Sequence, residues 1–390
     1  MKKRITFVML FVTFGLFATW VVEPLSLNPF KEIVTPSVES TINYDCEQSN
    51  SQSDMRLKKS ADTILDKYMD LNEFLGVSAG FFKEGCGTYI AGAGFSSKRD
   101  NSKASSIMLS RIASITKPMT AIAIMQLYER GVLDLDAPIQ AYLDDFPRKT
   151  EGKITIRELL RHTSGVPHYS SKIDAISFKN YSSLADAVDS FKLRELRFKP
   201  GEAYEYSSYG YTILGAILEK VSGVTYEEYM KNNIWLKAGM LNTSLERDGI
   251  YQNKSRLYLK VKSTYIRSPY TNLSVIYPAG GVQSTVEDLL KFGAAVINNE
   301  LIGRDTLEMM IDVTNSLAPT GGDDPYGFGW SVYDTPAHGR MIAHSGSQLG
   351  ASAYFSIYLD EKIVTAVLSN AFGTKNSAYH LSKEISDLIM

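Results

Sequence analysis

Ser114-Ile115-Thr116-Lys117 is the stretch of sequence that decides the fold of this chain. An apolar run that starts with proline, residues 118–128, follows it at once and has the pattern of a buried helix. Side chains three residues apart share a helix face, so the Lys117 amine can reach the Ser114 hydroxyl. A lysine kept neutral by desolvation can take the proton of a serine that attacks a carbonyl. The stretch therefore predicts an activated serine nucleophile, for which the rest of the chain must supply the context.

The composition is that of an ordinary globular protein. The chain has 390 residues, of which 44% are hydrophobic and 22% charged, enough to bury a large core. Its 41 basic and 43 acidic residues nearly balance, so nucleic acid is not an expected partner. Two cysteines and five scattered histidines exclude a disulfide-stapled scaffold and show no zinc-site spacing. We expect neither a metal nor another cofactor.

The N-terminus has the pattern of an export signal. Three basic residues at positions 2–4 precede an uncharged apolar run, residues 5–22, which as a helix would span about 27 Å. No clean cleavage site follows, so we expect a membrane anchor with the body outside the cytoplasm, a cleaved signal peptide being the alternative. The polar residues 23–54 predict a flexible tether. Cys46 and Cys86 could form a disulfide there, or both could be free thiols.

Residues 55–390 are predicted to form one domain of the α+β class. Residues 55–69 have helix periodicity, and two strand patterns follow them around a short turn. Helical patterns then dominate residues 118–299, after which short strands return. The expected strands are residues 76–82, 87–92, 327–333, 340–344, 351–358 and 363–369, and a helix closes the chain from about residue 377. An antiparallel sheet built from both chain ends, with flanking helices and a mostly helical insert, is therefore expected.

This order of elements resembles the beta-lactamase and penicillin-binding protein superfamily, and several strings resemble its class C beta-lactamase-like serine hydrolases. The matching strings, in order, are Ser114-Ile115-Thr116-Lys117, Leu159-Leu160-Arg161-His162-Thr163-Ser164-Gly165, Tyr206-Ser207-Ser208, Ala279-Gly280-Gly281 and His344-Ser345-Gly346. The second string is long and specific. The resemblance runs from about residue 57 to the C-terminus and implies an α/β sandwich of the DD-peptidase and beta-lactamase type.

The resemblance implies three catalytic residues, Ser114, Lys117 and Tyr206. Ser114 would be the nucleophile, and Tyr206 a general base whose pKa a neighbouring Lys117 ammonium would lower. Tyr251 and Tyr270 match the family's Tyr-x-Asn letters better. We prefer Tyr206 because it follows a Pro-Gly turn and precedes a helical pattern of the family's type.

Two substrate-binding positions depart from the family pattern. Ser208 stands where asparagine is most common, and a hydroxyl has fewer donors with which to hold a substrate amide. His344 stands where beta-lactamases have the lysine of Lys-Thr-Gly, and a histidine near its usual pKa of about 6.5 is mostly neutral at pH 7. Recognition of a free carboxylate should therefore be weaker. A purely structural His344 is the alternative to a substrate-lining one.

The residues after His344 are expected to line the substrate site. Ser345, Gly346 and Ser347 would form a strand edge there, with Gly346 allowing close approach of the backbone. The resemblance implies that the Ser347 and Ser114 amides form an oxyanion hole. His162 is expected to order the wall of the site through hydrogen bonds rather than to catalyse.

These observations predict a serine hydrolase that forms an acyl-enzyme on an ester or amide. An esterase, or a peptidase for D-amino-acid or cell-wall-type peptides, is favoured over a beta-lactamase. A penicillin-binding sensor or scaffold without turnover is the alternative from another class. The expected partner is a small-molecule or peptide substrate, with the membrane added if the N-terminal segment is not cleaved.

Overall fold

The computed structural model describes residues 38–44, 51–169, 176–249, 251–317 and 324–390. The export signal or anchor expected within residues 1–22 lies outside these ranges, as does Cys46. In the described ranges, no helix combines the length and the apolar character needed to cross a bilayer.

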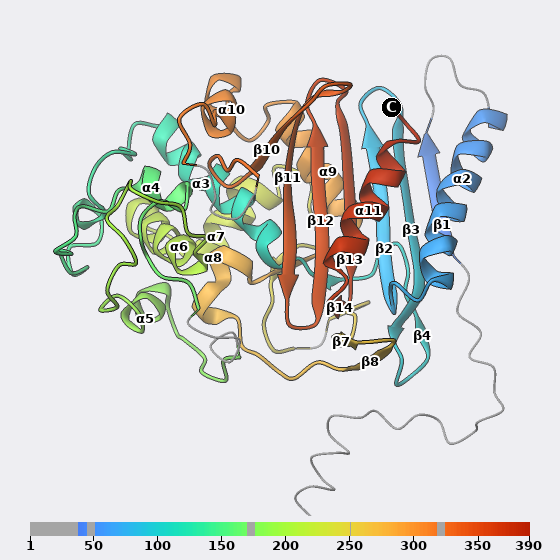
Figure 1. Cartoon of the computed structure of the whole chain (residues 1–390), viewed down its shortest axis with the longest axis horizontal. Helices are drawn as coiled ribbons and strands as arrows, with labels where there is room; N and C mark the ends of the chain where they lie inside the picture. Colours follow the sequence, from blue (N-terminus) through green and yellow to red (C-terminus); the bar gives the residue numbers. More distant parts are fainter. Residues whose placement is uncertain (1–37, 45–50, 170–175, 250, 318–323) are drawn as a thin grey trace, which may run out of the picture.

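An antiparallel sheet of eight strands forms one half of the molecule (Figure 1). Its order is β1-β3-β2-β13-β12-β11-β10, with β4 added to β3. The strands are β1 (Glu39–Tyr44), β2 (Gly76–Lys83), β3 (Gly87–Ser97), β4 (Ser102–Lys103), β10 (Ser331–Thr335), β11 (Gly339–Gln348), β12 (Ala351–Tyr358) and β13 (Ile363–Ser369). Since β2 pairs with β13, the two ends of the chain build one sheet, as the sequence predicts.

Helices cover both faces of this sheet. Helices α2 (Ser51–Asp70) and α11 (Lys375–Ser386) pack on one face, and α9 (Val286–Ile297) packs on the other (Figure 1). Every residue of the central strands β12 and β13 is buried. The two faces of the sheet therefore contribute to two separate hydrophobic cores, and the predicted α+β sandwich is confirmed.

The regular structure between the two parts of the sheet is mainly helical, and loops connect it. Its helices are η1 (Ala113–Ile115), α3 (Thr116–Glu129), η2 (Ile139–Ala141), α4 (Ile156–Leu160), α5 (Leu184–Asp189), α6 (Ser208–Ser222), α7 (Tyr226–Met230), η3 (Lys231–Trp235), η4 (Ser274–Ile276) and α8 (Tyr277–Gly280), and α10 (Arg304–Ile311) follows α9. Two small sheets join it to the rest: β5 (Ser110–Arg111) with β9 (Val282–Ser284) and β6 (Ser244–Leu245), and β7 (Tyr258–Val261) with β8 (Thr264–Arg267) and β14 (Ala371–Phe372).

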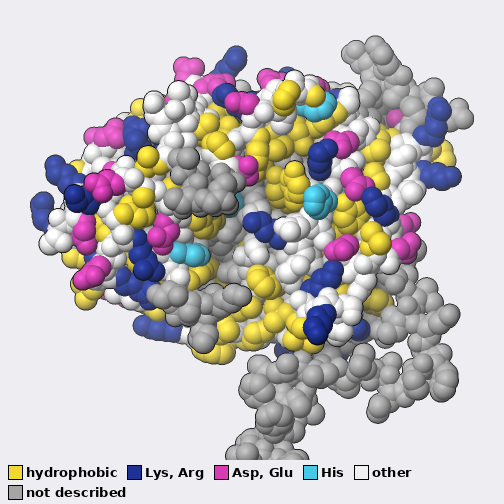
Figure 2. All heavy atoms as spheres, in the orientation of Figure 1, with side chains coloured by type: hydrophobic (Ala, Val, Ile, Leu, Met, Phe, Trp, Pro, Cys, Tyr) yellow, Lys and Arg dark blue, Asp and Glu magenta, His cyan; other side chains and the backbone are white. Residues whose placement is uncertain are grey.

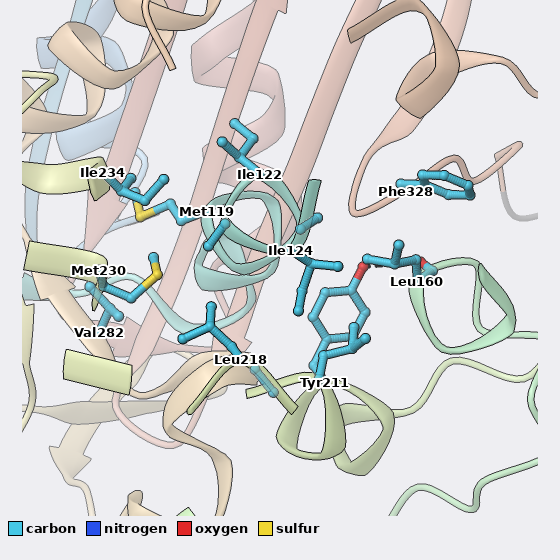
Figure 3. Packing of buried hydrophobic residues seen from close by; sticks show 14 of the residues in the cluster. Met119, Ile122, Ile124, Leu160, Tyr211, Leu218, Met230, Ile234, Val282 and Phe328 are labelled. Carbon is cyan, nitrogen blue, oxygen red and sulfur yellow. Dashed lines mark hydrogen bonds between the residues drawn. The ribbon is translucent and has the colours of Figure 1, made fainter. Parts of the chain in front are cut away.

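Helix α3 is the central element of the helical half. Every residue from Thr116 to Leu127 is buried, so α3 has no solvent-facing side over this length. Figure 3 shows its Met119, Ile122 and Ile124 surrounded by apolar side chains from other segments, among them Leu218 of α6. A helix packed on all sides holds its first turn rigidly, and that turn follows Ser114 directly.

The expectation of a flexible tether over residues 23–54 is wrong for part of that range. Strand β1 lies inside it and pairs with β3, and Ile42 packs against the hydrophobic core beneath α2. Helix α2 also begins at Ser51, before the predicted domain start. Cys86 is disulfide-bonded, which excludes the free-thiol alternative for this residue.

Candidate active site

The structure places Ser114 where the sheet half meets the helical half. It lies in the short helix η1, two residues before α3 begins. Ala113 has a positive φ of 49°, so the backbone turns sharply just before the serine. Ser114 is partly exposed, whereas the residues on both sides of it are buried. A single hydroxyl is therefore presented to solvent at the end of a buried helix.

The Lys117 amine is fully buried beside this serine. Its Nζ lies 3.3 Å from the Ser114 Oγ and 3.3 Å from the Ser208 Oγ. A third hydrogen bond, 2.8 Å long, goes to the main-chain carbonyl of Ala279 in α8. The Tyr206 ring centroid lies 4.6 Å from the same nitrogen. Three stretches of the chain, residues 114–117, 206–208 and 279, therefore meet at one amine.

Burial lowers the pKa of Lys117 well below its usual value of 10.5. No carboxylate in the described part of the chain forms an ion pair with Lys117 to offset that cost. The neutral amine is therefore favoured, and a neutral amine has the lone pair that a base requires.

Tyr206 lies in the loop before α6, with its ring beside Lys117. Burial raises the pKa of its phenol above the usual value of 10, and a hydrogen bond with Ser114 opposes that rise only partly. The expected lowering of the Tyr206 pKa by a Lys117 ammonium is therefore wrong, because the lysine is itself desolvated. Tyr206 is protonated in the resting site. Its phenol can donate a proton and take one back, with Lys117 as the neighbouring base.

The other two tyrosines lie elsewhere. The Lys254 Nζ lies over the Tyr251 ring in a cation–π contact, 4.8 Å from the ring centroid. The Tyr270 hydroxyl donates to Asp248 at 2.9 Å. Neither contacts Lys117, so of the three tyrosines only Tyr206 joins the serine and the lysine.

Two histidines, a buried His162 and a half-buried His168, hold the segment that carries Tyr206 and Ser208. The Ser207 N–H donates to Nδ1 of His162 at 3.1 Å, and the Ser208 N–H donates to Nδ1 of His168 at 3.1 Å. Burial lowers the pKa of both imidazoles, that of His168 to about 4, so both are neutral acceptors. His162 thus orders the wall of the site through backbone hydrogen bonds, as the sequence predicts.

His344 is buried and does not project into the opening. Its Nδ1 lies 2.7 Å from the Ser345 carbonyl, so Nδ1 carries the hydrogen. Its Nε2 then accepts from the Tyr326 hydroxyl at 3.0 Å. Burial lowers the pKa of His344 to about 3, and only 4% of the residue is exposed. The substrate-lining role expected for this side chain is therefore replaced by the structural alternative.

The free edge of β11 is the second wall of the site. Gly346 approaches η1 so closely that a Cβ there would lie 2.3 Å from the Ile112 carbonyl oxygen. Gln348 and Ala351 close the two-residue hairpin to β12 and form a hydrogen-bonded pair, so Ser347 and Ser352 form a non-bonded one. The Ser347 N–H therefore points away from β12, and β10 ends its pairing at Ala343.

Side chains alternate along β11. Ile342 belongs to the core on the helical side of the sheet, and Met341 and Ala343 belong to the core beneath α11. By this alternation the Ser345 and Ser347 side chains face the α11 side. These two serines can thus meet a substrate at the site through their backbone rather than their hydroxyls.

Two contacts of the site could not be assigned from the sequence. The Ala279 carbonyl that binds Lys117 was only part of a matching string, and nothing in the sequence distinguishes Tyr326 from the other tyrosines. The Tyr326 ring packs against the His162 ring at 4.8 Å between centroids. Since its hydroxyl also donates to His344, Tyr326 connects His162 with His344, and Tyr206 packs against both histidines. In the described residues, no group of three His, Cys, Asp or Glu side chains could hold a metal ion.

Comparison with known proteins places this site in a family. A family model described as Beta-lactamase matches residues 61–386. Penicillin-binding protein 4* of Bacillus subtilis is 32% identical over 282 residues, which cover 67% of this chain and 60% of that protein. The human mitochondrial serine beta-lactamase-like protein LACTB is 27% identical, with 81% of this chain and 74% of that protein covered. The crystal structure of a penicillin-binding protein from Bacillus halodurans superposes with a TM-score of 0.73 at 27% identity, covering 83% of this chain and 98% of that one.

Proposed function

We propose that this chain, which belongs to the beta-lactamase family, is a serine hydrolase that forms an acyl-enzyme on an ester or amide substrate. An ester, or a D-amino-acid or cell-wall-type peptide, is the favoured substrate class. The observation that carries the proposal is the fully buried Lys117 amine, 3.3 Å from a partly exposed Ser114 hydroxyl.

The first step is attack of the Ser114 oxygen on the substrate carbonyl. The serine proton passes to the neutral Lys117 amine as the new carbon–oxygen bond forms. The resulting ammonium is stabilised by the Ala279 carbonyl at 2.8 Å and by the face of the Tyr206 ring. A base that is neutral before the reaction and solvated by fixed dipoles afterwards lowers the barrier for this transfer.

The second step is collapse of the tetrahedral intermediate. Its oxyanion is held by the backbone N–H groups of Ser114 and Ser347, for which the orientation of the Ser347 N–H gives support. The Tyr206 phenol gives its proton to the leaving alcohol or amine as the bond breaks, and Lys117 returns a proton to the phenolate. Water then attacks the acyl-enzyme, its proton is taken by the same pair, and Ser114 is released.

The surroundings of the nucleophile favour a substrate without a carboxylate next to the scissile bond. His344 is neutral and both of its ring nitrogens are engaged within the protein, so it offers no charge to a carboxylate. Ser208 offers one hydroxyl, already 3.3 Å from Lys117. These features favour an ester over a beta-lactam.

The test uses an active-site probe and three substrate classes. The purified chain is treated with a fluorophosphonate, and separately with p-nitrophenyl acetate, a D-Ala-D-Ala peptide and nitrocefin. We expect labelling at Ser114 and turnover of the ester, both lost in Ser114→Ala. Labelling that persists in Ser114→Ala would exclude Ser114 as the nucleophile.

A penicillin-binding protein without turnover is the second candidate, because two of the compared proteins carry that name and Ser208 departs from the family pattern. In that case nitrocefin or penicillin would acylate Ser114 in one stoichiometric burst, and the acyl group would remain bound for hours. Mass spectrometry of the intact protein separates a trapped acyl-enzyme from a turning-over one.

We further propose that residues 5–22 export the chain and hold its body outside the cytoplasm. The basic residues before this apolar run support that orientation. Membrane fractionation of cells that express the full chain, followed by protease treatment of intact cells or spheroplasts, tests it. Recovery of the chain in the cytosol would contradict it.

A further inference from the structure

A second hollow lies next to the site and is strongly basic. It is a cavity of about 480 Å³, bordered by β8, by the segment before β7 and by the loop that follows β6. We call it the basic cavity. Among the described residues, its lining includes five cationic side chains and two carboxylates. The cationic ones are Arg111, Arg247, Lys254, Arg256 and Arg267, and the carboxylates are those of Glu246 and Asp248.

One carboxylate at the base of this cavity is shared by two cations. The Glu246 carboxylate lies 2.7 Å from the Arg111 Nε and 3.2 Å from the Lys254 Nζ. Burial opposes its ionisation, but Arg111 and then Lys254 hold its pKa below the usual value. Glu246 is therefore charged and compensates one of its two partners, which leaves an excess of positive charge in a largely buried position.

Other cations of the lining use carboxylates from outside the cavity. Arg247 pairs with Glu227 at 2.7 Å, and Arg256 lies 3.7 Å from Asp100. Neither of these carboxylates lines the hollow. Cations thus outnumber carboxylates among the described residues of the lining, and such an excess attracts an anionic group.

An unpaired hydroxyl adds an independent indication of a ligand. Ser255 lines the cavity and is only 4% exposed, yet its Oγ has no hydrogen-bond partner in the part of the chain that the structure describes. Buried polar atoms usually find a partner, because leaving one unpaired destabilises the folded state. Rotation of the Ser255 side chain toward the cavity would let a ligand oxygen provide that partner.

Arg111 connects the cavity to the nucleophile. It lies three residues before Ser114, so the two Cα atoms are at most about 11 Å apart. Its guanidinium also donates to the carbonyl of Leu349, in the hairpin turn just after Ser347. Leu257, another lining residue, contacts the glycine of that turn. Figure 1 shows β7 and β8 beside the lower end of the sheet, where β11 turns into β12.

We propose that the basic cavity binds an anionic oxygen group, a carboxylate or a phosphate, on a part of the substrate that extends away from the scissile carbonyl. This inference rests on the proposed hydrolase for its biological meaning and deepens it, because it specifies an anionic extension on an ester or amide. The cavity contacts that group through Arg267, Lys254 and the Ser255 hydroxyl. The nucleophile's own surroundings lack a fixed cation for a carboxylate, so the charge recognition is displaced to this second hollow.

Direct binding tests the cavity without requiring catalysis. Sodium phosphate and sodium acetate are titrated calorimetrically into the full chain and into Arg267→Ala, Ser255→Ala and Lys262→Gln. Lys262→Gln is the matched control, because it removes a charge from the same β7–β8 hairpin but does not line the cavity. We expect saturable binding of one or both anions, weakened about tenfold in the first two variants and unchanged in the third. No saturable binding, or equal loss in all three, overturns the proposal.

Kinetics then test the substrate extension. Acetate esters of 1,6-hexanediol, 6-hydroxyhexanoate and 6-hydroxyhexyl phosphate share an acyl group and a spacer and differ in the charge at the far end. We expect kcat/KM to be about tenfold higher for an anionic ester than for the neutral one, a preference lost in Arg267→Ala and Ser255→Ala. The ester with the higher kcat/KM shows whether the cavity prefers a carboxylate or a phosphate on the substrate.

The two proposals fail in different ways. If the neutral ester is hydrolysed but no anionic preference exists, the cavity proposal is overturned and the hydrolase stands. If no ester is turned over and Ser114 is not labelled, the hydrolase fails, while the calorimetric result still decides whether the cavity binds anions.

Discussion

The protonation of a single side chain should control the acid limb of activity. Burial lowers the pKa of Lys117, and the reaction needs its neutral form. As the pH falls through that pKa, the amine takes a proton and the base is lost. We therefore expect kcat/KM for p-nitrophenyl acetate to fall tenfold for each pH unit below the pKa of Lys117 and to be constant above it. The pKa obtained from this profile should lie below 10.5. A limb that follows a pKa of about 10.5 would mean that Lys117 is not desolvated during turnover.

Removal of the amine supplies the control for this profile. Lys117→Met keeps an apolar side chain of similar length in the buried position, so the fold around α3 should persist. We expect kcat/KM to drop by about 10²–10⁴ and the acid limb to disappear. A variant that keeps the limb would assign it to another group.

Tyr206 can be tested apart from its ring. Tyr206→Phe keeps the aromatic face 4.6 Å from Lys117 but removes the phenol that is proposed to protonate the leaving group. We expect kcat to fall by about 10²–10⁴, with a smaller change in KM. The fall in kcat should be larger for alkyl esters than for p-nitrophenyl esters, because the p-nitrophenolate leaving group needs no proton.

Tyr204→Phe is the matched control. Tyr204 lies in the same loop, and its ring packs edge-on to His162 at 6.0 Å, but it does not contact Lys117. It should retain activity within a few-fold. Equal losses in the two variants would point to a structural effect on the loop.

For single residues, the sequence predicts those contacts that depend only on spacing along the chain. Ser114 and Lys117 meet because they are three residues apart on one helical turn, and their contact follows from that alone. The burial of His344 and its bond to Tyr326 depend on pairing between segments distant in the fold, and spacing carries no information about them. The same holds for the Tyr206 pKa, whose direction reverses once the lysine beside it is buried.

At the scale of elements, the approach of β11 to η1 depends on one glycine. A Cβ on Gly346 would lie 2.3 Å from the Ile112 carbonyl oxygen, a backbone atom that cannot rotate away. We expect Gly346→Ala to displace the β11 edge from η1 and to lower the free energy of unfolding by about 1–3 kcal/mol. Because the oxyanion hole would be disturbed, kcat should fall while KM changes less. Urea unfolding and ester kinetics measure the two effects.

Gly210→Ala is the control for this prediction. Gly210 lies in α6, where an added Cβ would have its nearest neighbour at 3.5 Å, an ordinary contact, and alanine favours helix. Its stability should be unchanged or slightly higher. Normal kcat in Gly346→Ala would mean that the two elements are not required to lie so close.

Elements with strong local signals were predictable, and those held by distant partners were not. Helix α9 lies within residues 118–299, where helical patterns were expected, because its apolar positions repeat with helix periodicity and the Thr285 side chain caps its first turn. Strand β1 is short and polar, and its conformation is fixed by pairing with β3. The β7–β8 hairpin, which borders the basic cavity, also had no signal in the sequence that we recognised.

At the scale of the whole molecule, the order of elements along the chain predicts the architecture. Strand patterns at both ends with helices between them require the ends to meet in one sheet, which the pairing of β2 with β13 confirms. The interface between the two halves could not be predicted in detail. Three histidines lie around one buried lysine there, two of them buried and His168 half-buried, and each of them is neutral at pH 7.

These histidines should make the stability of the molecule depend on pH. The pKa of His344 is about 3 in the folded state, and that of His168 is about 4, against about 6.5 for an unfolded chain. Between pH 6.5 and these lower values, the unfolded state binds protons that the folded state does not. Stability is therefore full above pH 6.5 and decreases as the pH falls.

Urea unfolding at pH 7 and pH 5 measures this loss, which should be about 2 kcal/mol for each such histidine. His344→Gln keeps a side chain that can accept from Tyr326 and donate to the Ser345 carbonyl, but it has no proton to gain over this range. We expect the variant to be less stable at pH 7, yet to lose about 2 kcal/mol less than the unmodified chain on acidification. His380→Gln changes an exposed histidine of α11 and should leave the difference unaltered. An identical loss in the unmodified chain and His344→Gln would show that the interface accommodates a charged imidazole, and would reopen a cationic role for His344 in binding a substrate carboxylate.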